Sequence, residues 1–190
     1  MKWLIFSGLF FISFSFLYSF FNNKPVNIED KAKSFYDYSA LTIDGDEFKF
    51  SNLKGKKVII VNVASKCGYT PQYAGLQELY DKYGDKVEIL GFPSNDFLWQ
   101  EPGKNSEIKT FCSTKYNVTF PLFDKISVKK NKKQHPVYSW LSHIKLNGSN
   151  DNAPSWNFCK YLINEKGEFV AFYSSSVKPL GEEILGFIND

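Results

Sequence analysis

Cysteine is the residue type in this chain best suited to chemistry, and it occurs at Cys67, Cys112 and Cys159. These thiols are too few for a disulfide scaffold, and their spacings match no paired zinc-ligand pattern. The reactive form of a cysteine is its thiolate. We therefore expect at least one of the three to react as a nucleophile.

Cys67 follows an apolar run that predicts a buried strand, and a helical pattern begins soon after it. The stretch from Val61 to Thr70 reads V-N-V-A-S-K-C-G-Y-T. Backbone N–H groups and the positive end of a helix dipole stabilise a thiolate at such a turn, and the neighbouring Lys66 favours it further. Position alone leaves two interpretations open, a reactive thiolate and a small core side chain.

The periodicity of apolar residues predicts the elements that position this turn. Asp44-Gly45 separates two short segments and predicts a tight β-hairpin, whereas the β-branched run 58–63 is typical of a central strand covered on both faces. Further elements follow: a helix from Pro71 to Gly84, a strand at 87–92, helices at 106–116 and 135–144, a hairpin of strands 158–163 and 169–173, and a closing helix from Pro179.

This order of elements is that of an α/β domain of thioredoxin-like fold. We expect a central mixed sheet flanked by helices, with an N-terminal β-hairpin and a helical insertion, although the periodicity also fits other α/β sandwiches. A length of 190 residues, 43% of them hydrophobic, suits one domain, which we place at 35–190. The net charge of +3 is too small to favour nucleic acid as a partner.

Three stretches resemble the signature motifs of glutathione peroxidases in order and spacing: N-V-A-S-K-C-G-Y-T, G-F-P-S-N-D-F-L-W-Q-E-P-G and W-N-F-C-K-Y-L-I. The resemblance extends over nearly everything from Phe35 onward. It implies a thioredoxin-like fold and a thiol peroxidase that reduces hydrogen peroxide and organic or lipid hydroperoxides without a cofactor. Cys67 stands at the position of the peroxide-reacting residue, and the residues that complete the family's site are Gln100, Trp156 and Asn157.

The chemistry of these side chains agrees with that assignment. Peroxide attack needs a thiolate and a donor to the leaving oxygen. Gln100 and Asn157 offer amide N–H groups, and Trp156 offers an indole N–H on an apolar wall. The chain contains no arginine, so neutral donors must serve instead. Taken singly, Gln100 also fits a surface glutamine and Trp156 a core tryptophan.

Cys112 is the predicted resolving thiol, which would condense with the sulfenic acid of Cys67. The stretch F-C-S-T-K-Y-N-V-T-F-P resembles the segment in which thioredoxin-dependent members of the family carry this cysteine. Because Cys112 falls on the apolar face of a predicted helix, we expect residues 106–119 to unwind locally before it reacts. The alternative is a passive core cysteine.

Several positions depart from the family's pattern. Ser94 replaces a frequent cysteine, so it cannot resolve the sulfenic acid. Asp96 replaces a common glutamine, and Leu98-Trp99 replace small residues, which could narrow or gate the pocket. On a strand Cys159 would face the same side as Asn157, which leaves a redox role open, but we expect it to be a spectator thiol.

Two reductants compete for the oxidised enzyme, a thioredoxin-like protein and glutathione. A disulfide between Cys67 and Cys112 would be a natural substrate of a thioredoxin dithiol, and the absence of arginine removes a clamp for glutathione carboxylates. The short segment between Leu141 and Trp156 predicts a monomer. A peroxide sensor or redox relay that oxidises client proteins requires nearly the same residues and remains an alternative; an inactive structural module is the third.

The first residues form a separate segment. Residues 3–21 are apolar and uncharged, and they predict a targeting segment at 1–21, followed by a linker at 22–34. Both a cleaved signal peptide and an uncleaved anchor fit this length. We expect entry into the secretory pathway, where the acceptor patterns at Asn117 and Asn147 would become meaningful.

Overall fold

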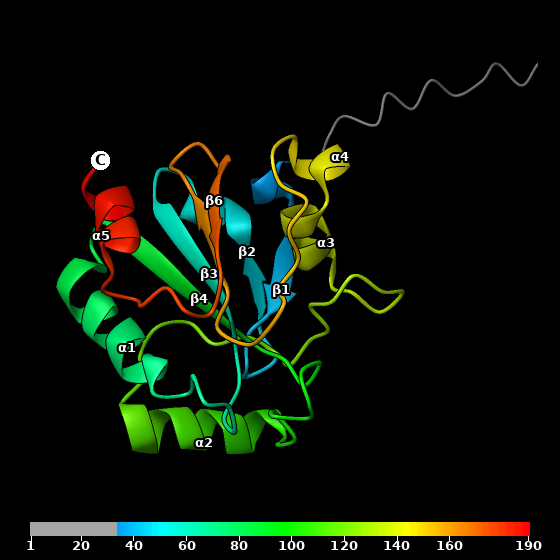
Figure 1. The fold of residues 1–190 in the computed structure, drawn as a ribbon, viewed down its shortest axis with the longest axis vertical. Coiled ribbons are helices and arrows are strands. Elements are labelled where there is room, and N and C mark those ends of the chain that lie inside the picture. Colours follow the sequence, from blue (N-terminus) through cyan, green and yellow to red (C-terminus); the bar gives the residue numbers. More distant parts are fainter. Residues whose placement is uncertain (1–33) are drawn as a thin grey trace, which may run out of the picture. The chain divides into compact units, whose positions relative to one another are not determined.

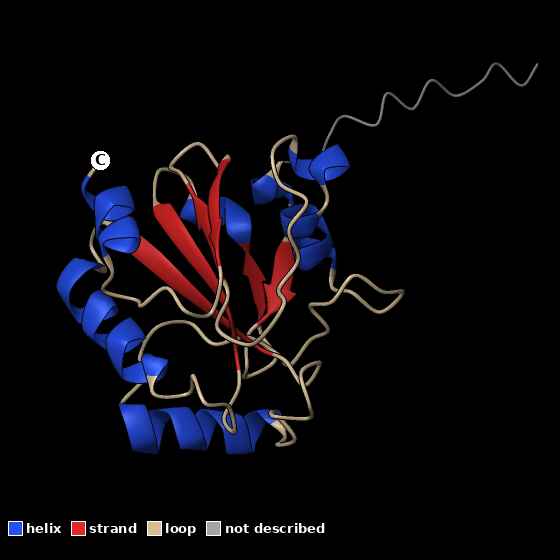
Figure 2. Cartoon of the chain, in the orientation of Figure 1, coloured by secondary structure: helices blue, strands red, loops and turns tan. Residues whose placement is uncertain are grey.

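A four-stranded mixed sheet in the order β4-β3-β5-β6 forms the centre of the computed structural model, which describes residues 34–190 (Figures 1 and 2). β3 runs parallel to β4 and antiparallel to β5, and β6 runs antiparallel to β5. The strands are β3 (Lys57–Val63), β4 (Val87–Pro93), β5 (Lys160–Ile163) and β6 (Phe169–Tyr173). The predicted central strand is therefore confirmed as β3, every residue of which is buried.

The two faces of β3 contact different halves of the core, because side chains alternate along a strand. Ile59 and Val61 belong to a cluster with residues of α1 (Gln72–Tyr83) and α5 (Glu182–Asn189). Val58 and Ile60 belong to the opposite cluster, which includes residues of α3 (Pro136–Ser142). Figure 1 shows α1 and α5 on one side of the sheet and α3 on the other. The predicted mixed sheet flanked by helices is confirmed.

The N-terminal hairpin is also confirmed. β1 (Ser39–Leu41) pairs with β2 (Glu47–Lys49) around a turn in which Gly45 has a φ of 93°. Short 3-10 turns at Phe35–Asp37 and Phe50–Leu53 flank the hairpin and bury phenylalanine rings in the cluster that contains α3.

Three element boundaries differ from the predictions. The helix expected at 135–144 ends at Ser142, because His143 adopts an extended backbone (φ −127°), and the short helix α4 (Ile144–Asn147) follows. The closing helix begins at Glu182 rather than near Pro179. The strand expected from residue 158 begins at Lys160.

The local chain explains the last two differences. Pro179 is buried and packs against Gly75 of α1, where even a Cβ on the glycine would be 3.3 Å from the proline ring. The chain therefore contacts α1 at Pro179 before the closing helix starts. Phe158 has a φ of 66°, which is incompatible with a strand. The expectation that Asn157 and Cys159 share one strand face is therefore wrong.

The segments predicted at 1–21 and 22–34, apart from Ser34, lie outside the described residues. Within 34–190, no helix combines the length and the apolar character needed to cross a membrane.

Candidate active site

Cys67 lies in the turn between β3 and α1, with 8% of its surface exposed. The N–H of Tyr69 donates to its Sγ over 3.4 Å. α1 begins only at Gln72, so the turn separates the thiol from the first helical residue. The predicted strand-to-turn placement is confirmed, while Tyr69 supplies the one backbone hydrogen bond to this sulfur found in residues 34–190.

Thr70 holds the turn in its shape. Its Oγ1 accepts from the N–H of Cys67 (2.9 Å) and donates to the carbonyl of Ala64 (2.8 Å). The N–H of Thr70 also donates to the carbonyl of Cys67 (3.0 Å). Because Thr70 is buried, water competes poorly with these bonds, and they orient the cysteine backbone.

Gln100 joins the cysteine turn to the segment after Trp156. Its carbonyl accepts from the N–H of Lys66 (3.0 Å), and its side-chain Oε1 accepts from Nδ2 of Asn157 (2.9 Å). Residues that are distant in sequence therefore meet around Cys67. Asn157 is fully buried, whereas Gln100 is partly exposed.

The amide pair retains one unused N–H₂ group in either orientation. As placed, Asn157 donates to Gln100, its own Oδ1 is buried without a partner, and Nε2 of Gln100 is free to donate. Turning both amides over preserves the bond between them and makes Nδ2 of Asn157 the unpartnered group. An unpartnered polar group at full burial is costly, which is typical of a position reserved for a ligand or reacting atom.

Asn62 is a buried polar residue in the middle of β3 that positions the same segment. Its Nδ2 donates to the carbonyl of Trp156 (2.9 Å), and its Oδ1 accepts from the N–H of Cys159 (3.1 Å). Its backbone carbonyl accepts from the N–H of Phe158. These bonds allow Phe158 its left-handed conformation and fix Asn157 between them.

Trp156 is half-buried and contacts both halves of the core. Its ring centroid lies 5.7 Å from that of Phe97. Trp156 and Tyr69 line one open cleft of about 340 Å³ together with Ser155 and residues 174–176. The backbone N–H of Tyr69 also binds Sγ of Cys67, so this cleft lies next to the cysteine turn.

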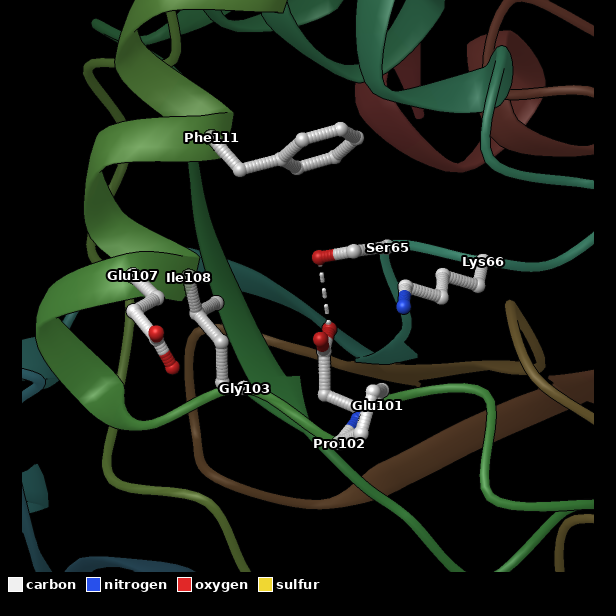
Figure 3. Close-up of a pocket in the computed structure, with 8 residues that line it drawn as sticks. All are labelled: Ser65, Lys66, Glu101, Pro102, Gly103, Glu107, Ile108 and Phe111. Atoms are coloured by element: carbon white, nitrogen blue, oxygen red, sulfur yellow. Dashed lines mark hydrogen bonds between the residues drawn. The ribbon is translucent and has the colours of Figure 1, made fainter.

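A second hollow, of about 380 Å³, lies between the cysteine turn and α2 (Asn105–Tyr116) (Figure 3). Ser65 and Lys66 line one side, and Phe111 projects from α2 on the other. Glu101 is buried beneath it and accepts from Oγ of Ser65 over 3.1 Å. Burial raises the pKa of Glu101 to about 6, while the bonds from Ser65 and the charge of Lys125 oppose the rise.

Cys112 lies on α2, as predicted, and is fully buried. Burial raises the pKa of its thiol to about 11. The hydroxyl of Tyr73 is close enough to lower that pKa somewhat, but it does not reach hydrogen-bonding geometry. Cys112 and Cys67 are free thiols, and the hollow that contains Glu101 separates the cysteine turn from α2.

Cys159 is a buried free thiol whose Sγ lies 3.7 Å from Oγ of Ser175. The same hydroxyl donates to the carbonyl of Asn157 (2.6 Å), so Ser175 helps to hold the backbone of Asn157 in place. The adjacent Lys160 is fully buried, and its Nζ donates to Oε1 of Gln72 and to the carbonyl of Val177. Burial lowers the pKa of Lys160 to about 8.

The four residues of the predicted peroxide site thus lie on segments that hydrogen bonds and ring contacts bring together, whereas Cys112 lies on α2 and shares only the buried core cluster with Cys67. Sequence reasoning overlooked Asn62, Thr70 and Glu101. Asn62 carried a readable signal, because a polar residue inside an apolar strand needs a buried partner. Across residues 34–190, no group of three His, Cys, Asp or Glu side chains could hold a metal ion.

Comparison with known proteins adds independent findings. A family model described as glutathione peroxidase matches residues 35–142. A glutathione peroxidase-like peroxiredoxin of Schizosaccharomyces pombe is 49% identical over 146 residues, covering 76% of this chain and 91% of that protein. A hydroperoxy fatty acid reductase of Synechocystis is 44% identical over 152 residues, covering 76% and 88%.

Solved structures agree on the fold. The crystal structure of Trgpx in apo form has a TM-score of 0.62 and 34% identity, covering 84% of this chain and 97% of that one. A secreted disulfide oxidoreductase of Mycobacterium tuberculosis has a TM-score of 0.54 at 15% identity, covering 82% and 96% of the two chains, and supports only the thioredoxin-like fold.

Proposed function

This chain belongs to the glutathione peroxidase family and is a thiol peroxidase, and from that premise we propose that Cys67 is the thiol that attacks the hydroperoxide. The observation that carries the assignment is the Asn157–Gln100 amide pair, joined to the cysteine turn through the Lys66–Gln100 hydrogen bond. This pair supports the proposal because it keeps a spare amide donor on a segment that is hydrogen-bonded to the turn of a nearly enclosed thiol.

The first step oxidises Cys67. Its thiolate attacks the terminal oxygen of ROOH, the O–O bond breaks, and the products are a sulfenic acid and RO⁻, which takes up a proton to leave as ROH. The spare amide N–H and the indole N–H of Trp156 stabilise the negative charge on the leaving oxygen. Neither group carries a proton that it could lose near neutral pH, so water supplies the proton.

The second step uses Cys112. Its thiol condenses with the sulfenic acid, forming a disulfide and releasing water. Because α2 buries Cys112, the helix must unwind locally before the two sulfur atoms meet. A dithiol protein of thioredoxin type then reduces the disulfide by thiol exchange. The peroxiredoxin-like names of the relatives support this reductant over glutathione.

A peroxide-consumption assay tests these roles. The purified chain receives hydrogen peroxide with thioredoxin and its reductase, or with glutathione. We expect Cys67→Ser to abolish turnover and Cys112→Ser to remove thioredoxin-driven turnover while Cys67 still oxidises once. Cys159→Ser is the matched control and should retain turnover. Thioredoxin-driven turnover in Cys112→Ser would reject the resolving role, and slow turnover combined with efficient oxidation of client proteins would favour a relay.

The remaining assignments rest on sequence. We propose that residues 1–21 direct the chain into the secretory pathway, as a cleaved signal or an anchor, and that the enzyme is a monomer. Determining the N-terminus of the protein recovered from cells distinguishes a cleaved signal from an anchor. Light scattering during gel filtration measures the mass.

A further inference from the structure

The loop between β4 and α2 carries an exposed apolar tip directly before Gln100. Leu98 and Trp99 are 69% and 77% exposed, and both adopt left-handed backbone conformations, with φ of 50° and 52°. The N–H of Gln100 donates to the carbonyl of Phe97 (3.1 Å) and closes a tight turn around them. Positions of this kind favour glycine, and here they carry two large apolar residues.

These side chains contribute little to the packing of the core, because most of their surface is exposed. The loop is nevertheless firmly built, because the N–H of Glu101 donates to Oδ1 of Asn95 (2.9 Å) and Asp96 accepts from the N–H groups of Val128 and Lys129. A rigid loop that holds strained, exposed apolar residues is typical of a surface that contacts something outside the chain.

One lysine side chain lies against the base of the tip, and further lysines are near it. Nζ of Lys129 lies 4.6 Å from the ring of Phe97, whereas Lys66 binds Gln100 through its backbone N–H and its side chain lines the hollow that contains Glu101 (Figure 3). Lys132 and Lys133 belong to the same 127–134 loop as Lys129. Within the described part of the chain, none of these four lysines forms a salt bridge.

The nearby carboxylates are engaged elsewhere. Oδ2 of Asp96 accepts from Ser127, Val128 and Lys129, and Glu101 is buried. Asp151 pairs with Lys130. The surface around Leu98 and Trp99 is therefore apolar at its tip, and the adjacent 127–134 loop carries four lysines and no carboxylate of its own, against the single charge of Asp96.

We propose that the Leu98–Trp99 tip docks this enzyme on an anionic lipid bilayer. Trp and Leu are suited to the interface between headgroups and acyl chains, and lysines that carry no salt bridge are attracted to anionic headgroups. A bilayer accommodates a convex tip, whereas a protein partner would need a matching pocket. Docking presents the cysteine turn to the lipid surface, and it does not depend on which residues carry out the peroxidase reaction.

Co-sedimentation with vesicles of phosphatidylcholine and phosphatidylserine tests the proposal on the full chain. Because residues 3–21 are themselves apolar, wild type is compared with Leu98→Gly/Trp99→Gly, so that the leader contributes equally to both. Glycine relieves the strain of the left-handed backbone, so the melting temperature of the variant should be at least as high as that of wild type. The matched control, Ile144→Ser/Leu146→Ser, removes two other exposed apolar side chains.

We expect the vesicle-bound fraction of wild type and of the control to exceed that of the glycine variant when phosphatidylserine is present. Replacing Lys129, Lys132 and Lys133 by Gln should weaken binding to these vesicles about a hundredfold, at about fivefold for each lysine. Equal bound fractions of wild type and the glycine variant would overturn the proposal. So would an absence of vesicle binding combined with slower reduction by thioredoxin in the glycine variant, because the tip would then dock a protein. Wild type that binds the vesicles but consumes no peroxide would refute the proposed function alone.

Discussion

Thr114 offers a direct test of whether α2 unwinds before Cys112 reacts. This residue is exposed on α2, so alanine or glycine in its place changes backbone preference and leaves the core intact. Both substitutions remove the same bond from Oγ1 of Thr114 to the carbonyl of Thr110, and a comparison between the two variants cancels that loss.

The size of the effect follows from helix propensity. Glycine is about 1 kcal/mol less favourable than alanine inside a helix, and this is about fivefold in an unwinding equilibrium. With a pKa of about 11, the buried Cys112 thiol is ionised in about one molecule in 10,000 at pH 7, whereas an exposed thiol is ionised to a few per cent. Unwinding thus raises the thiolate fraction about 300-fold, so the unwound state should carry the reaction.

Disulfide formation is measured after one equivalent of hydrogen peroxide, by quenching samples with an alkylating reagent and weighing them by mass spectrometry. Thr114→Gly should form the disulfide about fivefold faster than Thr114→Ala. Gly186 on α5 provides the control, since a Cβ there meets nothing within 4 Å. Gly186→Ala makes the same exchange in a helix without a thiol and should leave the rate unchanged. Equal rates in the two Thr114 variants would refute the unwinding step, and an equal effect at Gly186 would trace it to global stability.

Three further predictions concern the site and its frame. Asn157→Ala should slow the first oxidation of Cys67 by about a hundredfold to a thousandfold, as loss of one positioned donor does, and an unchanged stopped-flow rate would reject the donor role. Because burial raises the pKa of Glu101 to about 6, above about 4.3 in an unfolded chain, wild-type stability should fall by about 2 kcal/mol as pH rises through this window. Urea unfolding on both sides of the window should show no such fall in Glu101→Gln; an equal fall there would place its cause in another group. Gly167→Ala should lower the melting temperature more than Gly148→Ala. Both glycines have a φ near 80°, but only a Cβ at Gly167 would clash with the ring of Tyr36, at 2.6 Å. Equal decreases in melting temperature would show that the ring moves away freely.

The fold was largely predictable because its elements have clear periodicity. The apolar run of β3 and the helical spacing of Leu76 and Leu79 are local signals, and both elements formed where expected. The boundaries that differed depend on long-range contacts. Phe158 leaves the strand conformation because Asn62, far away in sequence, binds the backbone on both sides of it.

The candidate site divides in the same way. The motifs identified Cys67, Gln100, Trp156 and Asn157, and the structure brings their segments together. Periodicity could not reveal the hydrogen bond between Glu101 and Ser65 or the burial of Lys160, since each depends on how distant segments pack. Nor could it show that Leu98 and Trp99 point outward.

The distance along the chain between the two halves of the site also affects how the protein is made. Asn157 reaches its place only after β5 pairs with β3, and more than half of the domain lies between these strands in sequence. Such long-range antiparallel pairing forms late in folding. A nascent chain emerging from the ribosome therefore exposes Cys67 long before its amide donors arrive, and during synthesis this thiol should be no more sensitive to peroxide than any other. The delay protects the unfinished protein from being oxidised before it can fold.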